Sequence, residues 1–72
     1  MVTDTALELK QTLSTMFRRI EAGEDITHQL LRIDTLAREI SPTAPTMLKH
    51  YLERRSYTKA LAFLEHEMAS TT

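Results

Sequence analysis

The sequence predicts an all-α fold, a small four-helix domain made of two consecutive helical hairpins, a long pair and then a short pair. Three observations carry this prediction. The 72 residues include one glycine, two prolines and no asparagine, so the turn residues that β-hairpins require are scarce. Hydrophobic residues make up 42% of the chain, as in ordinary globular proteins. They recur three and four residues apart, the spacing of one helix face. A chain of this length forms one domain, so we expect a single helical domain over residues 1–72.

The first helix is expected over about residues 4–22. Thr5 and Glu8 have the spacing of a capping box at its start. Gly23 ends it, because glycine adopts the left-handed conformation at a helix C-terminus without a steric penalty. The apolar face of this helix is Ala6, Leu9, Leu13, Met16 and Ile20.

The second helix is expected over about residues 26–40, with Asp25 or Thr27 as its N-cap. Ser41-Pro42 ends it, because the residue before a proline avoids helical backbone angles. The predicted apolar stripe of this helix is Ile26, Leu30, Ile33, Ala37 and Ile40.

The second hairpin is expected over about residues 44–55 and 57–69. Thr43 is predicted to cap its first helix, with Pro45 in the first turn, and Ser56 to cap its second helix. The intervening sequence also permits one continuous helix, so the separation of the two remains open. The apolar faces are Leu48, Tyr51 and Leu52 on the first helix, and Tyr57, Ala60, Leu61, Leu64 and Met68 on the second.

Enzymatic chemistry has little support in the residue types present. The chain has no cysteine, which removes thiolate metal ligands and thiol nucleophiles. No two of the three histidines lie four apart, and none belongs to an HExxH pattern. In Glu65-His66-Glu67 the side chains point about 100° apart on a helix, so they cannot converge on one ion. We therefore predict no enzyme activity, no cofactor and no metal site.

The overall charge argues against a protein whose main function is to bind the phosphate backbone of nucleic acids. The chain has nine Lys and Arg residues and ten Asp and Glu residues, which gives a formal net charge of −1. The longest apolar run is far too short to span a membrane, and the first residues lack the features of a secretory signal. We therefore expect a cytoplasmic protein with no membrane partner.

One short region carries a local excess of positive charge, which we call the basic corner: Lys49, Arg54, Arg55 and Lys59, opposed by Glu53. Such a corner can receive an acidic protein partner, a phosphate or a nucleic-acid backbone. It can equally be ordinary surface charge, with the arginines complementing a helix C-terminal dipole.

Residues 36–43 followed by residues 47–52 resemble the helix-turn-helix family. An apolar residue followed by alanine lies on the first helix, and Ser41-Pro42 stands where the second helix is approached. The turn departs from the family pattern in lacking glycine. The resemblance implies a DNA- or RNA-binding regulator that uses residues 36–52. The exposed side chains of the second helix would then be Thr46, Lys49, His50 and Glu53.

A second resemblance covers residues 50–67. Tyr51-Leu52, Ser56-Tyr57 and the run at residues 59–65 (Lys-Ala-Leu-Ala-Phe-Leu-Glu) are similar to the hairpin of a tetratricopeptide repeat and to the dimerising LisH motif. Both families favour glycine where this chain has Ser56. Both associate with proteins, so the resemblance implies protein association and not chemistry.

Apolar residues beyond one stripe per helix favour association over an isolated chain. A small domain without disulfides gains little net stability from its own core. Apolar faces that the core does not bury are expected to pack against another molecule. We expect a homodimer, the commonest assembly. The apolar residues predicted to bind the partner are Leu31, Leu36, Tyr57 and Phe63.

These arguments lead to one functional hypothesis and one alternative. We expect a small protein–protein interaction or adaptor module that docks through apolar helix faces, with the basic corner steering an acidic partner. The alternative is a small DNA- or RNA-binding regulator.

Overall fold

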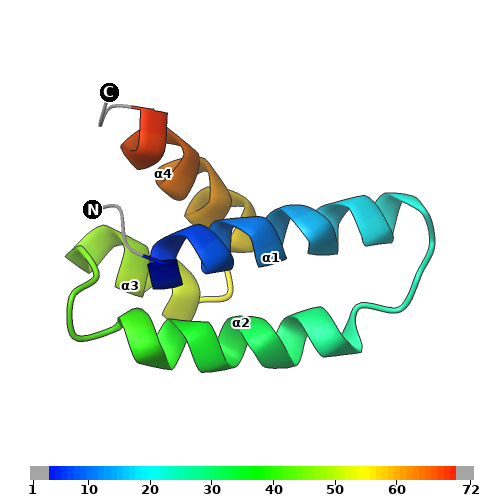
Figure 1. The fold of residues 1–72 in the computed structure, drawn as a ribbon, viewed down its shortest axis with the longest axis horizontal. Helices are drawn as coiled ribbons and strands as arrows, with labels where there is room; N and C mark the ends of the chain where they lie inside the picture. The colour runs from blue at the N-terminus through cyan, green and yellow to red at the C-terminus, as the bar shows by residue number, and fades with distance from the viewer. Residues whose placement is uncertain (1–3, 70–72) are drawn as a thin grey trace.

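A computed structural model describes residues 4–69, which form four α-helices and no strand (Figure 1). The all-α prediction and its two hairpins are confirmed: α1 and α2 lie side by side, and α3 packs on α4. A short turn separates α3 from α4, so they are not one continuous helix. The helices are α1 (Asp4–Glu21), α2 (Thr27–Ile40), α3 (Thr46–Glu53) and α4 (Tyr57–Ala69).

Helix α1 is the central element, because it packs on both α2 and α4. The apolar residues spaced three and four apart on each helix meet around it. This arrangement joins the two hairpins into one core. The buried hydrophobic residues are Ala6, Leu9, Leu13, Met16, Ile33, Leu36, Ile40, Leu48, Ala60 and Leu64.

The buried face of α2 differs from the predicted stripe. Ile33, Leu36 and Ile40 are each only 1% exposed, whereas Ala37 is half-buried. The predicted stripe and the observed buried residues both have steps of three and four residues, so the spacing alone does not choose between them. The predicted stripe is therefore wrong in including Ala37 and leaving out Leu36. On α1, the predicted core residue Ile20 is 50% exposed. The side chain of Met68 lies outside the described part of the chain.

The start of α1 also differs from the prediction. Because the helix begins at Asp4, Thr5 lies inside it and cannot be the N-cap of a capping box. The carboxylate of Glu8 instead accepts a hydrogen bond from Arg32 on α2. Glu8 thus joins two helices rather than closing the end of one.

The turn between α1 and α2 follows the sequence expectation. Gly23 has a φ of 73°, and two backbone bonds close the end of α1 as a Schellman motif. The Glu24 N–H donates to the Arg19 carbonyl at 2.8 Å, and the Gly23 N–H to the Ile20 carbonyl at 3.1 Å. Glycine is thus used where the backbone requires a positive φ.

Asp25 contacts the start of α2 from the preceding turn. Its Oδ1 accepts hydrogen bonds from the Thr27 N–H at 3.1 Å and the Thr27 hydroxyl at 2.7 Å. These bonds favour the ionised carboxylate, so they lower the pKa of Asp25 below its ordinary value. The N-cap of α2 is Ile26, and no side chain forms a capping hydrogen bond there. The prediction of Asp25 or Thr27 as the N-cap is therefore wrong, and Asp25 instead binds the first helical residue.

The turn between α2 and α3 is longer than predicted. Pro45 has extended backbone angles, φ −59° and ψ 149°, and precedes α3 instead of lying in its first turn. The Thr43 hydroxyl donates to the Ile40 carbonyl at 3.3 Å. Thr43 therefore stabilises the end of α2 and does not cap α3, which is shorter than expected at both ends.

Candidate interaction groove between α2 and α3

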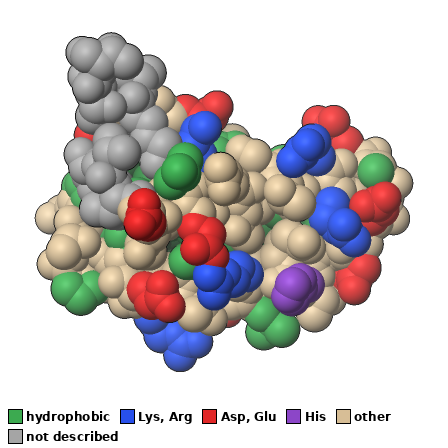
Figure 2. Space-filling view, viewed as in Figure 1, with side chains coloured by type: hydrophobic (Ala, Val, Ile, Leu, Met, Phe, Trp, Pro, Cys, Tyr) green, Lys and Arg blue, Asp and Glu red, His purple; other side chains and the backbone are tan. Residues whose placement is uncertain are grey.

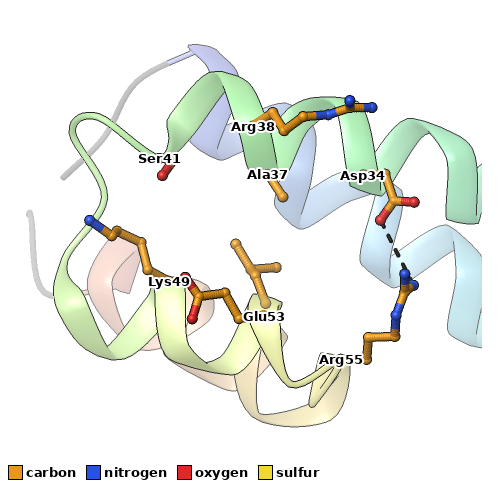
Figure 3. A pocket seen from close by; sticks show the side chains of 8 residues that line it. Asp34, Ala37, Arg38, Ser41, Lys49, Glu53 and Arg55 are labelled. Atoms are coloured by element: carbon orange, nitrogen blue, oxygen red, sulfur yellow. Dashed lines mark ion pairs between the residues drawn. The ribbon is translucent and has the colours of Figure 1, made fainter.

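A groove with a volume of about 470 Å³ opens between α2 and α3. The five-residue turn after α2 carries the chain back so that α3 faces the last turns of α2 across this groove (Figure 3). The groove is lined by Asp34, Ala37, Arg38 and Ser41 on one side and by Lys49, Leu52, Glu53 and Arg55 on the other.

The apolar part of the groove comes from Ala37 and Leu52. Both are half-buried, and Leu52 also packs against the core. Each lies three residues from a charged lining residue on its own helix, Asp34 on α2 and Lys49 on α3. Helical spacing therefore places each apolar side chain on the same helix face as a charged one.

The charged part of the groove contains three cations and two carboxylates. Arg38, Lys49 and Arg55 carry the positive charges, and Asp34 and Glu53 the negative ones. Arg55 pairs with Asp34 at 3.8 Å (Figure 3). Within residues 4–69, neither Arg38 nor Lys49 takes part in an ion pair. The groove thus offers two cations that no internal carboxylate neutralises by direct contact.

Arg55 makes a second contact within its own turn. Its Nη1 donates a hydrogen bond to the Tyr57 hydroxyl at 3.1 Å. The side chains of Arg55 and Asp34 are 66% and 46% exposed, so their ion pair is screened by water and adds little stability. A new carboxylate could therefore compete for this guanidinium at low energetic cost.

The structure divides the basic corner in two. Lys49 and Arg55 line the groove, whereas Arg54 and Lys59 are exposed outside its lining. Arg38 lines the groove and was missed by the sequence analysis. Residues 34, 37, 38 and 41 form one helical face, and this signal could have found it. Nothing in the sequence indicated, however, that α3 lies opposite that face.

The four predicted apolar contact residues have different environments. Leu31 is 62% exposed. Leu36 is buried in the core, so it is not available to a partner while the fold is intact. Tyr57 and Phe63 are half-buried against the core, and the Phe63 ring meets the Tyr51 ring edge-on, with centroids 6.4 Å apart.

Few large apolar side chains are exposed in the described part of the chain. Besides Leu31, the large hydrophobic residues left exposed in the described part of the chain are Leu7, Ile20 and Met47. On the side of the molecule in Figure 2, hydrophobic side chains are scattered among charged ones. Single exposed apolar residues of this kind are normal on a protein surface.

A smaller hollow of about 230 Å³ lies between α1 and α2. Its charged lining residues Glu8 and Arg32 already pair with each other. The side-chain oxygen of Gln29 is buried there without a hydrogen-bond partner. Because its charges are matched internally, this hollow offers less to a charged ligand than the α2–α3 groove.

The described residues contain no cluster of metal-ligating side chains. No three His, Asp or Glu side chains among them converge closely enough to hold a metal ion. Their core contains no buried polar or charged side chain. None of the four helices is both long enough and apolar enough to cross a membrane.

Comparison with known proteins gives no match: no protein-family model, curated protein sequence or solved structure corresponds to this chain.

Proposed function

We propose that the protein is a small protein–protein interaction module that holds an apolar, carboxylate-bearing segment of a partner in the α2–α3 groove. The observation that carries this proposal is an apolar pair, Ala37 and Leu52, in a groove that also contains two cations without internal ion pairs, Arg38 and Lys49. We place this function in the cytoplasm, as expected from the lack of secretory-signal features in the first residues.

The two parts of the groove have different tasks in this proposal. Apolar side chains of the partner would displace water from Ala37 and Leu52, which supplies most of the binding energy. The cations are exposed or half-buried, so they contribute more to the association rate and to the choice of partner than to affinity. A partner with carboxylates beside an apolar segment satisfies both parts.

Nucleic acid is the less favoured ligand of this surface. Asp34 and Glu53 lie within the groove, and carboxylates repel the closely spaced phosphates of DNA or RNA. Helix α3 also has only eight residues, and its exposed side chains include Glu53. The repulsion between the carboxylates of Asp34 and Glu53 and the phosphates adds to the unfavourable net charge of −1 of the whole chain.

Fluorescence anisotropy with three labelled probes tests the proposal. The first probe is an acidic peptide that repeats two leucines followed by two glutamates. The second is the same peptide with glutamine in place of each glutamate, and the third is a short DNA duplex. We expect the acidic peptide to bind most tightly. Equal binding of the two peptides would contradict the proposal, and DNA binding that falls steeply with salt would favour the nucleic-acid alternative.

Charge reversal locates the binding surface. Arg38→Glu should weaken binding of the acidic peptide about tenfold, because it replaces an attraction by a repulsion. Arg18→Glu is the matched control, since Arg18 is an exposed arginine on α1 that does not line the groove. If both variants lose the same affinity, binding depends on total charge and not on this groove.

A further inference from the structure

The end of α3 contains an arginine where the backbone favours glycine. Arg55 has a φ of 56°. The Ser56 N–H donates to the Tyr51 carbonyl at 2.8 Å, and the Arg55 N–H to the Leu52 carbonyl at 3.1 Å. These two bonds form a Schellman motif with Arg55 at the left-handed position.

The same motif at the end of α1 has glycine at this position, Gly23 with a φ of 73°. A residue with a Cβ is strained in this conformation, because the Cβ approaches a neighbouring carbonyl oxygen. Arg55 therefore reduces the stability of a turn that glycine would form with less strain. Such strained residues cluster at functional sites, where the side chain contributes something that glycine cannot.

The side chain of Arg55 is placed at the rim of the groove. Its Nη1 contacts the Tyr57 hydroxyl at 3.1 Å and the Asp34 carboxylate at 3.8 Å, and Figure 3 shows the guanidinium reaching toward α2. Within residues 4–69, no side chain or carbonyl accepts a hydrogen bond from its Nε or Nη2. These two nitrogens lie on one edge of the planar guanidinium, the edge that binds a carboxylate with two parallel hydrogen bonds.

We infer that Arg55 is a groove residue that binds a carboxylate of the partner, in addition to the attraction from Arg38 and Lys49, and that an arginine occupies this glycine-favouring position for this purpose. This inference rests on the proposed function of the groove. The contact with Asp34 supports carboxylate as the ligand chemistry, because Arg55 already lies beside this group within the chain. Tyr57 and Asp34 act as positioning residues that hold Nη1, while Nε and Nη2 bind the partner.

Two glycine substitutions at neighbouring arginines separate binding from stability. Arg55→Gly removes the guanidinium and relieves the backbone, so it should raise the melting temperature by about 4 °C and weaken acidic-peptide binding about tenfold. Arg54→Gly removes the same charge outside the groove, at a residue with an unstrained φ of −86°. It should lower the melting temperature slightly and leave peptide binding within about twofold.

A lysine variant tests the shape of the guanidinium. Arg55→Lys keeps the positive charge and the strained backbone but loses the two-nitrogen edge. We expect its melting temperature to match that of the wild-type protein and its affinity to fall about threefold, between wild type and Arg55→Gly.

Each outcome has a definite consequence. If the wild-type protein binds the acidic peptide and Arg55→Gly binds it equally well, the inference on Arg55 is wrong while the groove proposal stands. If Arg55→Gly lowers the melting temperature, Arg55 serves stability, and the inference is likewise overturned. If the wild-type protein does not bind the acidic peptide at all, the proposed function fails and the inference fails with it.

Discussion

At the scale of single residues, backbone geometry explains which turn residues the sequence identifies. Gly23 is recognisable because few other residues adopt a positive φ without strain. Arg55 has the same backbone geometry, but residue type gives no hint of it. The basic corner was visible in the sequence, whereas the pairing of Arg55 with Asp34 depends on a contact between residues 21 positions apart, which no local pattern encodes.

Gly23→Ala should lower the free energy of unfolding by about 1 kcal/mol. A Cβ at this position meets no atom within 4 Å, so the cost comes from the backbone alone. Urea unfolding monitored by circular dichroism measures the change. Arg55→Gly is the control of opposite sign, because it removes a Cβ from the same type of turn. An unchanged midpoint for Gly23→Ala would show that the turn tolerates a side chain.

Asp25 should make the stability of the protein depend on pH. Hydrogen bonds from Thr27 lower its pKa in the folded state below the ordinary value of 3.8. The unfolded state therefore binds the proton more readily, and the stabilisation is present above pH 3.8 and lost as the pH falls through the folded-state pKa.

Thermal melts of the wild-type protein and of Asp25→Ala over a pH series check this expectation. The variant should melt at a lower temperature near neutral pH, and the gap should shrink below pH 3.8. Asp25→Asn keeps the side-chain oxygen acceptor but does not titrate, so its melting temperature should depend less steeply on pH in this range. A gap between wild type and Asp25→Ala that stays constant with pH would contradict a stabilising role for the ionised Asp25 carboxylate.

At the scale of helices, the spacing of apolar residues identified all four helices, but it did not determine which face of α2 is buried. The predicted stripe and the observed one share Ile33 and Ile40 and differ at Leu36 and Ala37. The decision depends on how α2 lies against α1, which is a tertiary contact. The start of α3 was misplaced for a related reason: Pro45 fits either the first turn of a helix or the residue before it.

Two alanine substitutions on α2 test the revised buried face. Leu36→Ala should lower the free energy of unfolding by about 2–5 kcal/mol, since Leu36 is 1% exposed and the substitution leaves a cavity. Leu31→Ala is the matched control on the same helix. At 62% exposed, it should change stability by no more than about 0.5 kcal/mol. Equal effects of the two substitutions would mean that α2 packs with another face.

At the scale of the whole molecule, a single copy covers more of its apolar surface than the sequence suggested. Leu36 is in the core, and Tyr57 and Phe63 pack against it, so three of the four residues expected to face a partner also contact their own chain. The large apolar side chains that remain exposed in the described part of the chain are Leu7, Ile20, Leu31 and Met47. The homodimer therefore stays a prediction, and Leu31 is its best-exposed predicted contact residue.

Sedimentation velocity over a wide range of protein concentration tests self-association. We expect the wild-type protein to form a dimer at high concentration and Leu31→Asp to remain monomeric with an unchanged melting temperature, because this side chain lies outside the core. Arg18→Glu, at another exposed position, controls for the change in charge. A wild-type protein that sediments as one 8.3 kDa species at every concentration would contradict the dimer.

The central position of α1 has a consequence for biosynthesis. Helix α1 packs on α2, which follows it directly, and on α4, which is the last of the four to leave the ribosome. The first hairpin can form early, but the face of α1 that α4 covers stays open to water until translation of α4 is complete. During this interval the nascent chain exposes this hydrophobic face of α1, and chaperones that recognise exposed hydrophobic surfaces would bind it.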